Sequence, residues 1–152
     1  MSDHPDVMTR PPNIYFGFLI LGMVLQILFP WSFLPAAVQW FAGSFVFGLG
    51  LALMSAGIRQ MKNAGTGLKT HEPAETVLTE GLYRFSRNPL YVATTLMYSG
   101  IGLMFDNAWI LMLIVPLLAV MHYGVVLREE EYLEKKFGDR YLRYKSSVRR
   151  WL

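Results

Sequence analysis

Apolar residues along this chain gather into four long runs, which cover residues 13–29, 34–58, 90–105 and 108–127. Each run is close to the roughly 20 residues that an α-helix needs to cross a bilayer, the third being the shortest. Almost no polar stripe remains on any of them, which disfavours the alternative of four buried helices in a soluble bundle. The pattern predicts an all-α, polytopic membrane protein with about four transmembrane helices.

The connections between the runs complete this architecture. The segment PWSFLP, between the first two runs, has two prolines and no charge and suits a short turn at the membrane face. Only Asp106 and Asn107 separate the last two runs, so these are expected to form a helical hairpin. The polar remainder lies in a loop, residues 59–89, and a tail, residues 128–152, of one domain that spans residues 1–152.

Composition supports a membrane protein and excludes several chemistries. Hydrophobic residues make up 53% of the chain and charged residues only 16%, with a mean hydropathy of +0.32, which is too apolar for an ordinary soluble domain. The absence of cysteine excludes disulfides, thiolate metal sites and a cysteine nucleophile. His4, His71 and His122 lie far apart without metal-ligand spacing, so we expect no metal site. We also expect no nucleic-acid partner.

The basic residues predict the orientation. All 14 fall in three places: Arg10 precedes the first run, five lie between the second and third runs, and eight follow Leu127. With four spans these regions share one side, which the positive-inside rule makes cytoplasmic, whereas the other side carries only Asp106. We expect an integral protein of the inner or cytoplasmic membrane with both termini in the cytoplasm. The N-terminal residues do not resemble a cleaved signal peptide, so the first run should serve as its own insertion signal.

The stretch GLYRFSRNPLYV places polar chemistry directly before the third run. Asn88 followed by Pro89 is typical of an N-cap and a first helical residue. The free N–H groups of that helix start, with Arg84 and Arg87 beside them, suit a carboxylate or a phosphate. The alternative is that Asn88 only caps the helix and the arginines only anchor to lipid headgroups. These residues alone leave both interpretations open.

The tail contains a predicted amphipathic cytoplasmic helix. Its apolar face recurs at steps of three or four and comprises Val126, Glu130, Leu133, Phe137, Tyr141, Tyr144 and Val148. Gly138 can break this helix into two. Glu130 therefore occupies an apolar stripe, where a carboxylate is costly unless it has a partner. A nearby arginine or a cationic ligand could be that partner.

Two further features concern packing. Ser44, Gly48, Ala52 and Ala56 recur at intervals of four in the second run, so another backbone can approach that face closely, within the chain or in a homodimer. His122 is the one candidate in the runs for the ionisable group that a transporter needs, and we expect it instead to pack near the cytoplasmic end of the fourth run.

Two linked motifs resemble those of the isoprenylcysteine carboxyl methyltransferase and phospholipid methyltransferase superfamily of integral membrane enzymes. The resemblance covers about the C-terminal 90 residues. The first motif is matched by Leu78, Thr79, Gly81, Tyr83, Arg87, Asn88, Pro89 and Tyr91. The second, after the hydrophobic hairpin, is matched by Glu129, Glu130, Leu133, Phe137, Gly138, Tyr141 and Tyr144.

The resemblance implies methyl transfer from S-adenosylmethionine, with S-adenosylhomocysteine as product, in a pocket that loop 59–89 and tail 128–152 form at the cytoplasmic membrane edge. It implies these cofactor-binding residues: His71, Leu78, Gly81, Tyr83, Arg87, Asn88, Pro89, Tyr91, Glu129 and Glu130. The catalytic candidates among them are Arg87, Glu129 and Glu130. Asn88 stands where the carboxyl methyltransferases have histidine, and the chain is shorter than they are.

Two functions follow as expectations. The first is a membrane methyltransferase acting on a small or lipid-like acceptor, of the isoprenylcysteine-carboxylate, amine or thiol type. Methyl transfer is an in-line displacement, so the protein mainly aligns the acceptor, excludes water and supplies electrostatics; Glu129 or Glu130 could accept a proton from an amine or a thiol. The alternative is a non-catalytic four-span protein that binds anionic lipid or a partner through its basic tail.

Overall fold

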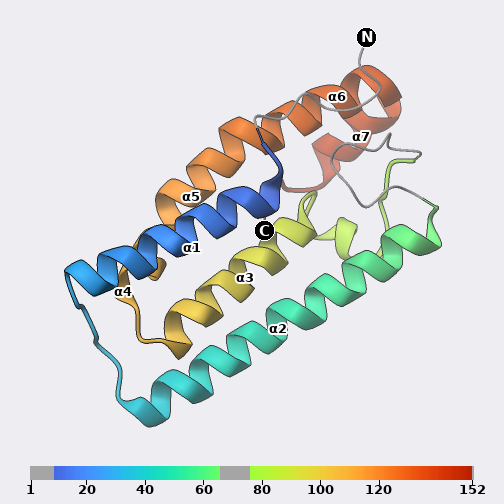
Figure 1. The fold of residues 1–152 in the computed structure, drawn as a ribbon. Helices are drawn as coiled ribbons and strands as arrows, with labels where there is room; N and C mark the ends of the chain where they lie inside the picture. Colours follow the sequence, from blue (N-terminus) through green and yellow to red (C-terminus); the bar gives the residue numbers. More distant parts are fainter. Residues whose placement is uncertain (1–8, 66–75, 152) are drawn as a thin grey trace.

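The computed structural model describes residues 9–65 and 76–151, and all regular structure within them is helical (Figure 1). The helices are, in chain order, α1 (Pro11–Leu28), α2 (Ala36–Asn63), η1 (Gly81–Arg84), α3 (Pro89–Met104), α4 (Ala108–Met112), α5 (Ile114–Met121), η2 (His122–Val126), α6 (Leu127–Phe137) and α7 (Asp139–Ser147). This confirms the predicted all-α fold. His71 lies outside the described residues.

Three helical segments among the described residues are long and apolar enough to cross a membrane: Pro11–Leu28, Ala36–Asn63 and Ala108–Phe137. The third predicted run corresponds to α3, which has 16 residues and so rises only about 24 Å, less than the roughly 30 Å of a hydrocarbon core. Three apolar helices are therefore established, whereas the count of four spans stays a prediction.

The outward faces of these helices are those of a protein surrounded by lipid. Phe16 and Ile27 of α1, Phe41 and Phe45 of α2, and Val115 of α5 are between 63% and 80% exposed. Large apolar side chains at this density would be an aggregation hazard in water, but in a bilayer they face acyl chains. The exposed faces thus agree with an integral membrane protein.

Helix α2 lies antiparallel to α3 along most of its length (Figure 1). Buried glycines at intervals of seven, Gly43, Gly50 and Gly57, make the close approach possible. A Cβ at Gly50 would lie 2.8 Å from the carbonyl oxygen of Ala93. The stripe from Ser44 to Ala56 lies on another face and is exposed, so its predicted packing within the chain is wrong, while packing in a homodimer stays a prediction.

The turn between α3 and α4 forms as the sequence predicts. Asp106 has a φ of 45° and is buried, and its carboxylate accepts from the backbone N–H groups of Phe33 and Leu34 at 3.0 Å. Asn107 caps α4 by accepting from the N–H of Ile110 at 3.1 Å. The two polar residues therefore close the hairpin and tie it to the connection between α1 and α2.

The segment Ala108–Phe137 continues as one helical rod through two irregularities. Pro116, in the first turn of α5, lacks an N–H, and in an uninterrupted helix its ring would clash with the carbonyl of Met112, which explains why α4 ends at Met112 and α5 begins at Ile114. A π-helical turn, η2, follows at His122–Val126. The rod of 30 residues is about 45 Å long, so α6 projects beyond the apolar layer and carries Glu129 and Glu130 to the polar end of the bundle.

The tail folds back at Gly138, whose φ of 52° suits a residue without a side chain. Gly138 thus divides the predicted amphipathic helix into α6 and α7, as expected. Tyr141 and Tyr144 of α7 are buried and pack with Val77. The polar end of the bundle is therefore built from residues 76–89, α6, α7 and the last residues of the chain.

Candidate functional site

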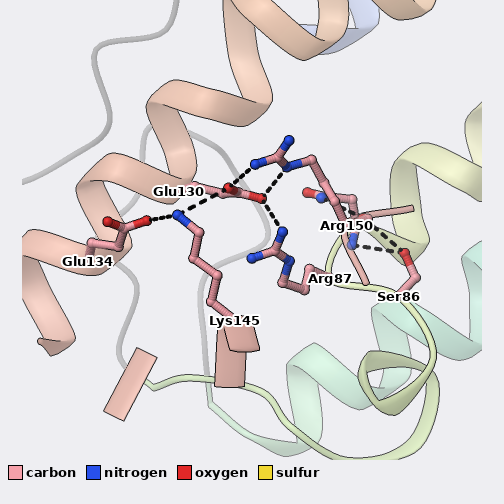
Figure 2. Close-up of polar contacts among 7 residues, drawn as sticks. Ser86, Arg87, Glu130, Glu134, Lys145 and Arg150 are labelled. Atoms are coloured by element: carbon pink, nitrogen blue, oxygen red, sulfur yellow. Dashed lines mark hydrogen bonds and ion pairs between the residues drawn. The ribbon is translucent and has the colours of Figure 1, made fainter. Parts of the chain in front are cut away.

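A buried carboxylate, Glu130, lies at the centre of the polar end (Figure 2). Its oxygens lie 3.3 Å from Nη2 of Arg87, 2.8 and 2.9 Å from Nε and Nη2 of Arg150, and 3.8 Å from Nζ of Lys145. Lys145 also pairs with Glu134. The cost of burying this carboxylate is offset by three cations. Of the two partners that the sequence left open, an arginine and a cationic ligand, the structure shows arginines.

The last described residues form a strap, residues 148–151, across the start of α3. The backbone N–H of Arg87 donates to the carbonyl of Arg149 at 3.0 Å. The carbonyl of Arg150 accepts from Nδ2 of Asn88 at 3.0 Å and from the hydroxyl of Ser86 at 3.3 Å. The strap therefore holds the residues before α3 against the tail while Arg150 pairs with Glu130.

Asn88 and Pro89 occupy the positions predicted for them, the N-cap and the first residue of α3. The Asn88 side chain makes no capping hydrogen bond, however, because its amide is turned to the strap. The capping interaction predicted for Asn88 is therefore wrong, and its side chain instead joins two distant segments.

Arg87 is buried with incomplete hydrogen bonding. Its side chain is 8% exposed, and Nη2 faces Glu130. Nε and Nη1 have no hydrogen-bond partner among residues 9–65 and 76–151. Buried guanidinium donors are normally satisfied, so a charged group with two free donors is a candidate for holding an anion.

Tyrosines surround this arginine. Tyr91 donates from its hydroxyl to Oε1 of Glu129 at 2.7 Å, and Tyr144 donates to the carbonyl of Tyr83 at 2.8 Å. Burial raises the pKa of Tyr144 to about 12, although Arg87 opposes the shift. Burial likewise raises the pKa of Tyr83, as do Tyr144 and Glu129. The phenols of Tyr83 and Tyr144 are therefore neutral at physiological pH, and their rings present flat apolar surfaces.

The other predicted residues lie on the loop that leads into α3. Leu78 is half-buried ahead of η1, and Pro89 is buried. Gly81 has a φ of 54° and lies against the side chain of Gln60, which accepts from the N–H of Leu82 at 3.2 Å. Gly81 thus lets the loop dock on the end of α2, and no contact with the Glu130 cluster involves it.

Arg150, Lys145 and Ser86 were missed as members of this site. Arg150 and Lys145 are among eight basic residues of the tail, and no spacing distinguishes them from the solvated ones. The helical periodicity extends only to Val148, so it could not predict that the strap reaches α3.

The fold and the cluster together define a helical membrane protein with a charged, tyrosine-lined site at one end. Residues 38–140 match the phospholipid methyltransferase family. The chain belongs to this family, because the match covers more than half of its length. It is also similar to an uncharacterized protein of Haemophilus influenzae, with 38% identity over 63 residues; the alignment covers 41% of this chain and 100% of that protein.

Proposed function

We propose that the protein is an S-adenosylmethionine-dependent methyltransferase that modifies a small or lipid-like acceptor. Family membership supports methyltransferase activity in a membrane. The observation that carries the cofactor assignment is Arg87, whose Nε and Nη1 are buried donors without partners in the described part of the chain. Nε–H and Nη1–H point to different sides of the guanidinium, so each can donate to a separate oxygen acceptor, and the carboxylate of S-adenosylmethionine is suited to one of them.

The surrounding residues fit the remainder of this cofactor. Tyr83 and Tyr91 offer aromatic faces and edges for an adenine or a cationic group. Glu129 supplies negative charge beside Tyr91 for the ammonium or the sulfonium. Glu130 differs from this expectation, since its oxygens already face three cations. We therefore assign Glu130 a positioning role, in which it fixes Arg87, and Arg87 and Glu129 the direct contacts.

The cofactor supplies an activated methyl group when bound, and the protein's part follows from the geometry. Arg87 and the tyrosines would orient the reactants, and the strap would exclude water from the start of α3. For an amine or thiol acceptor, the Glu129 carboxylate would take up the proton. A carboxylate acceptor, such as that of an isoprenylcysteine, would need no base. A lipophilic acceptor would enter sideways from the bilayer.

The orientation belongs to the same proposal. The polar end carries the loop and the tail, where most of the basic residues lie, and positive charge favours the cytoplasmic side. Both termini would then be cytoplasmic in an inner or cytoplasmic membrane, and the cofactor would enter from the cytoplasm.

Calorimetric titration of S-adenosylmethionine and S-adenosylhomocysteine into detergent-purified protein tests the proposal. We expect saturable one-site binding. Arg87→Ala should abolish it because the substitution removes the hydrogen-bond donors, and Glu130→Gln should weaken it because the substitution removes the carboxylate that positions Arg87. The matched control is Arg59→Ala, an exposed arginine of α2 outside the cluster, which should leave binding unchanged. No binding by folded wild-type protein, in detergent and again in lipid nanodiscs, would refute the enzyme proposal and favour a non-catalytic protein that binds lipid or a partner through its tail.

A further inference from the structure

A second charged feature lies at the polar end, apart from the Glu130 cluster. It is an open cleft of about 400 Å³ between η1 and α7, a volume within the range of small-molecule sites. Three arginines line it, Arg84 from the end of η1 and Arg140 and Arg143 from α7. The hydroxyl-bearing residues Thr79 and Ser147 also line it. None of these five residues contacts Glu130 or Arg87 through a side chain.

The arginine charges in this cleft are not neutralised by the described part of the chain. No carboxylate of residues 9–65 or 76–151 forms an ion pair with Arg84, Arg140 or Arg143. Among the residues that the structure describes, the side chain of Arg140 donates only to the hydroxyl of Thr76, at 3.3 Å. Three like charges around one cavity repel one another, so an anion with several oxygen acceptors would be strongly favoured there, and arginine forks match phosphate oxygens bidentately.

The position of the cleft indicates whether a phosphate bound there would belong to a membrane lipid or to a soluble molecule. Arg84 lies just before α3 begins, and α3 packs on the apolar helix α2, so the cleft lies at the level of the membrane boundary. Two exposed apolar residues are adjacent to these arginines in sequence. Phe85 follows Arg84 and is 72% exposed, and Leu142 precedes Arg143 and is 47% exposed. Arginines beside exposed apolar side chains are typical of surfaces that hold a headgroup and touch acyl chains.

We propose that this cleft binds the phosphate of an anionic membrane lipid. The arginines and hydroxyls hold the phosphate, while Phe85 and Leu142 contact the adjoining acyl region. The arginines proposed to hold the phosphate are not the residues proposed to hold the cofactor, although Tyr144 and Val148 of the neighbouring site also line the cleft. Substitution of the cleft arginines and substitution of Arg87 therefore test the two sites separately.

The test is calorimetric titration of short-chain phosphatidylglycerol into the full-length, detergent-purified protein. The variant Arg84→Gln/Arg140→Gln/Arg143→Gln should bind about 100-fold more weakly, on the usual worth of a basic residue at an anionic lipid surface. The matched control Arg10→Gln/Arg59→Gln/Lys62→Gln removes the same charge from exposed residues away from the cleft and should change the affinity less than about twofold. Circular dichroism and size-exclusion chromatography check that both variants are folded.

Two further ligands separate a lipid from other sources of the same chemistry. Glycerol 1-phosphate, which lacks acyl chains, should bind at least about tenfold more weakly than the lipid, since it loses the apolar contacts. Phosphatidylcholine, whose headgroup has no net charge, should also bind more weakly. The proposed site would be refuted if the cleft variant and the control variant lost affinity for phosphatidylglycerol equally, or if neither variant lost affinity. If glycerol 1-phosphate bound as tightly as phosphatidylglycerol, the assignment of a membrane lipid would be refuted and a soluble phosphate ligand would be indicated.

Discussion

Removal of the Glu130 carboxylate should be among the most destabilising single changes at the polar end. The side chains of Glu130 and Arg87 are only 5% and 8% exposed, and no described residue pairs with Nε or Nη1 of Arg87. Glu130→Ala would leave the whole guanidinium buried without a counterion. Breaking a buried ion pair in this way costs about 3–5 kcal/mol. Arg150 and Lys145, with side chains 29% and 34% exposed, can turn toward solvent and add less.

Equilibrium unfolding by dodecyl sulfate in mixed micelles measures this loss as a change in the free energy of unfolding. The neighbouring residue supplies a control: Glu131 is exposed and pairs with Lys135 at the surface, so Glu131→Ala should leave the stability nearly unchanged. In a double-mutant cycle, Arg87→Met should recover much of the loss caused by Glu130→Leu, because a buried pair replaced by apolar residues leaves no unpaired charge. A loss below about 1 kcal/mol for Glu130→Ala, or additive losses in the cycle, would refute the reasoning.

Three further predictions concern packing, a turn and pH. Gly50→Leu should destabilise the protein by about 1–3 kcal/mol, because its Cβ would meet α3 at 2.8 Å, whereas Gly48→Leu should be nearly neutral since nothing lies within 4 Å; the same unfolding assay compares them. Asp106→Ala should cost about 1–3 kcal/mol by leaving backbone donors unpaired, and equal stability would contradict the role of the turn. The pKa of Tyr144 is raised to about 12, above the ordinary value near 10, so its contribution to stability is complete below pH ~10 and is lost as pH rises through ~12. Tyr144→Phe should reduce that alkaline loss, and an unchanged stability-against-pH curve would count against it.

The sequence was most informative where one physical requirement dominates. Membrane spans need continuous apolar runs, so the helical architecture and the three long apolar helices were predictable. Glu130 was identifiable because a carboxylate in an apolar stripe needs a partner. The turn at Asp106 followed from the two polar residues that separate two apolar runs, and the break at Gly138 from a residue that weakens a helix interior and accepts a positive φ.

The sequence was least informative where several choices satisfy the same pattern. Small residues in α2 form two stripes, and the obvious one, at intervals of four, is exposed, whereas the glycines at intervals of seven contact α3. Both stripes are open to close packing, and only the position of α3 selects between them. The partner of Glu130 was undetermined in the same way, because any of the tail's basic residues has the required charge and Arg150 is selected by the strap, which has no periodicity.

An experimental structure of the protein with S-adenosylhomocysteine tests the central claim most directly. We predict that a carboxylate oxygen of the homocysteine lies about 3 Å from Nε or Nη1 of Arg87, with the Glu130 ion pairs intact and a tyrosine against the adenine. A ligand held elsewhere, with Nε and Nη1 of Arg87 still unpaired, would contradict the proposed cofactor site.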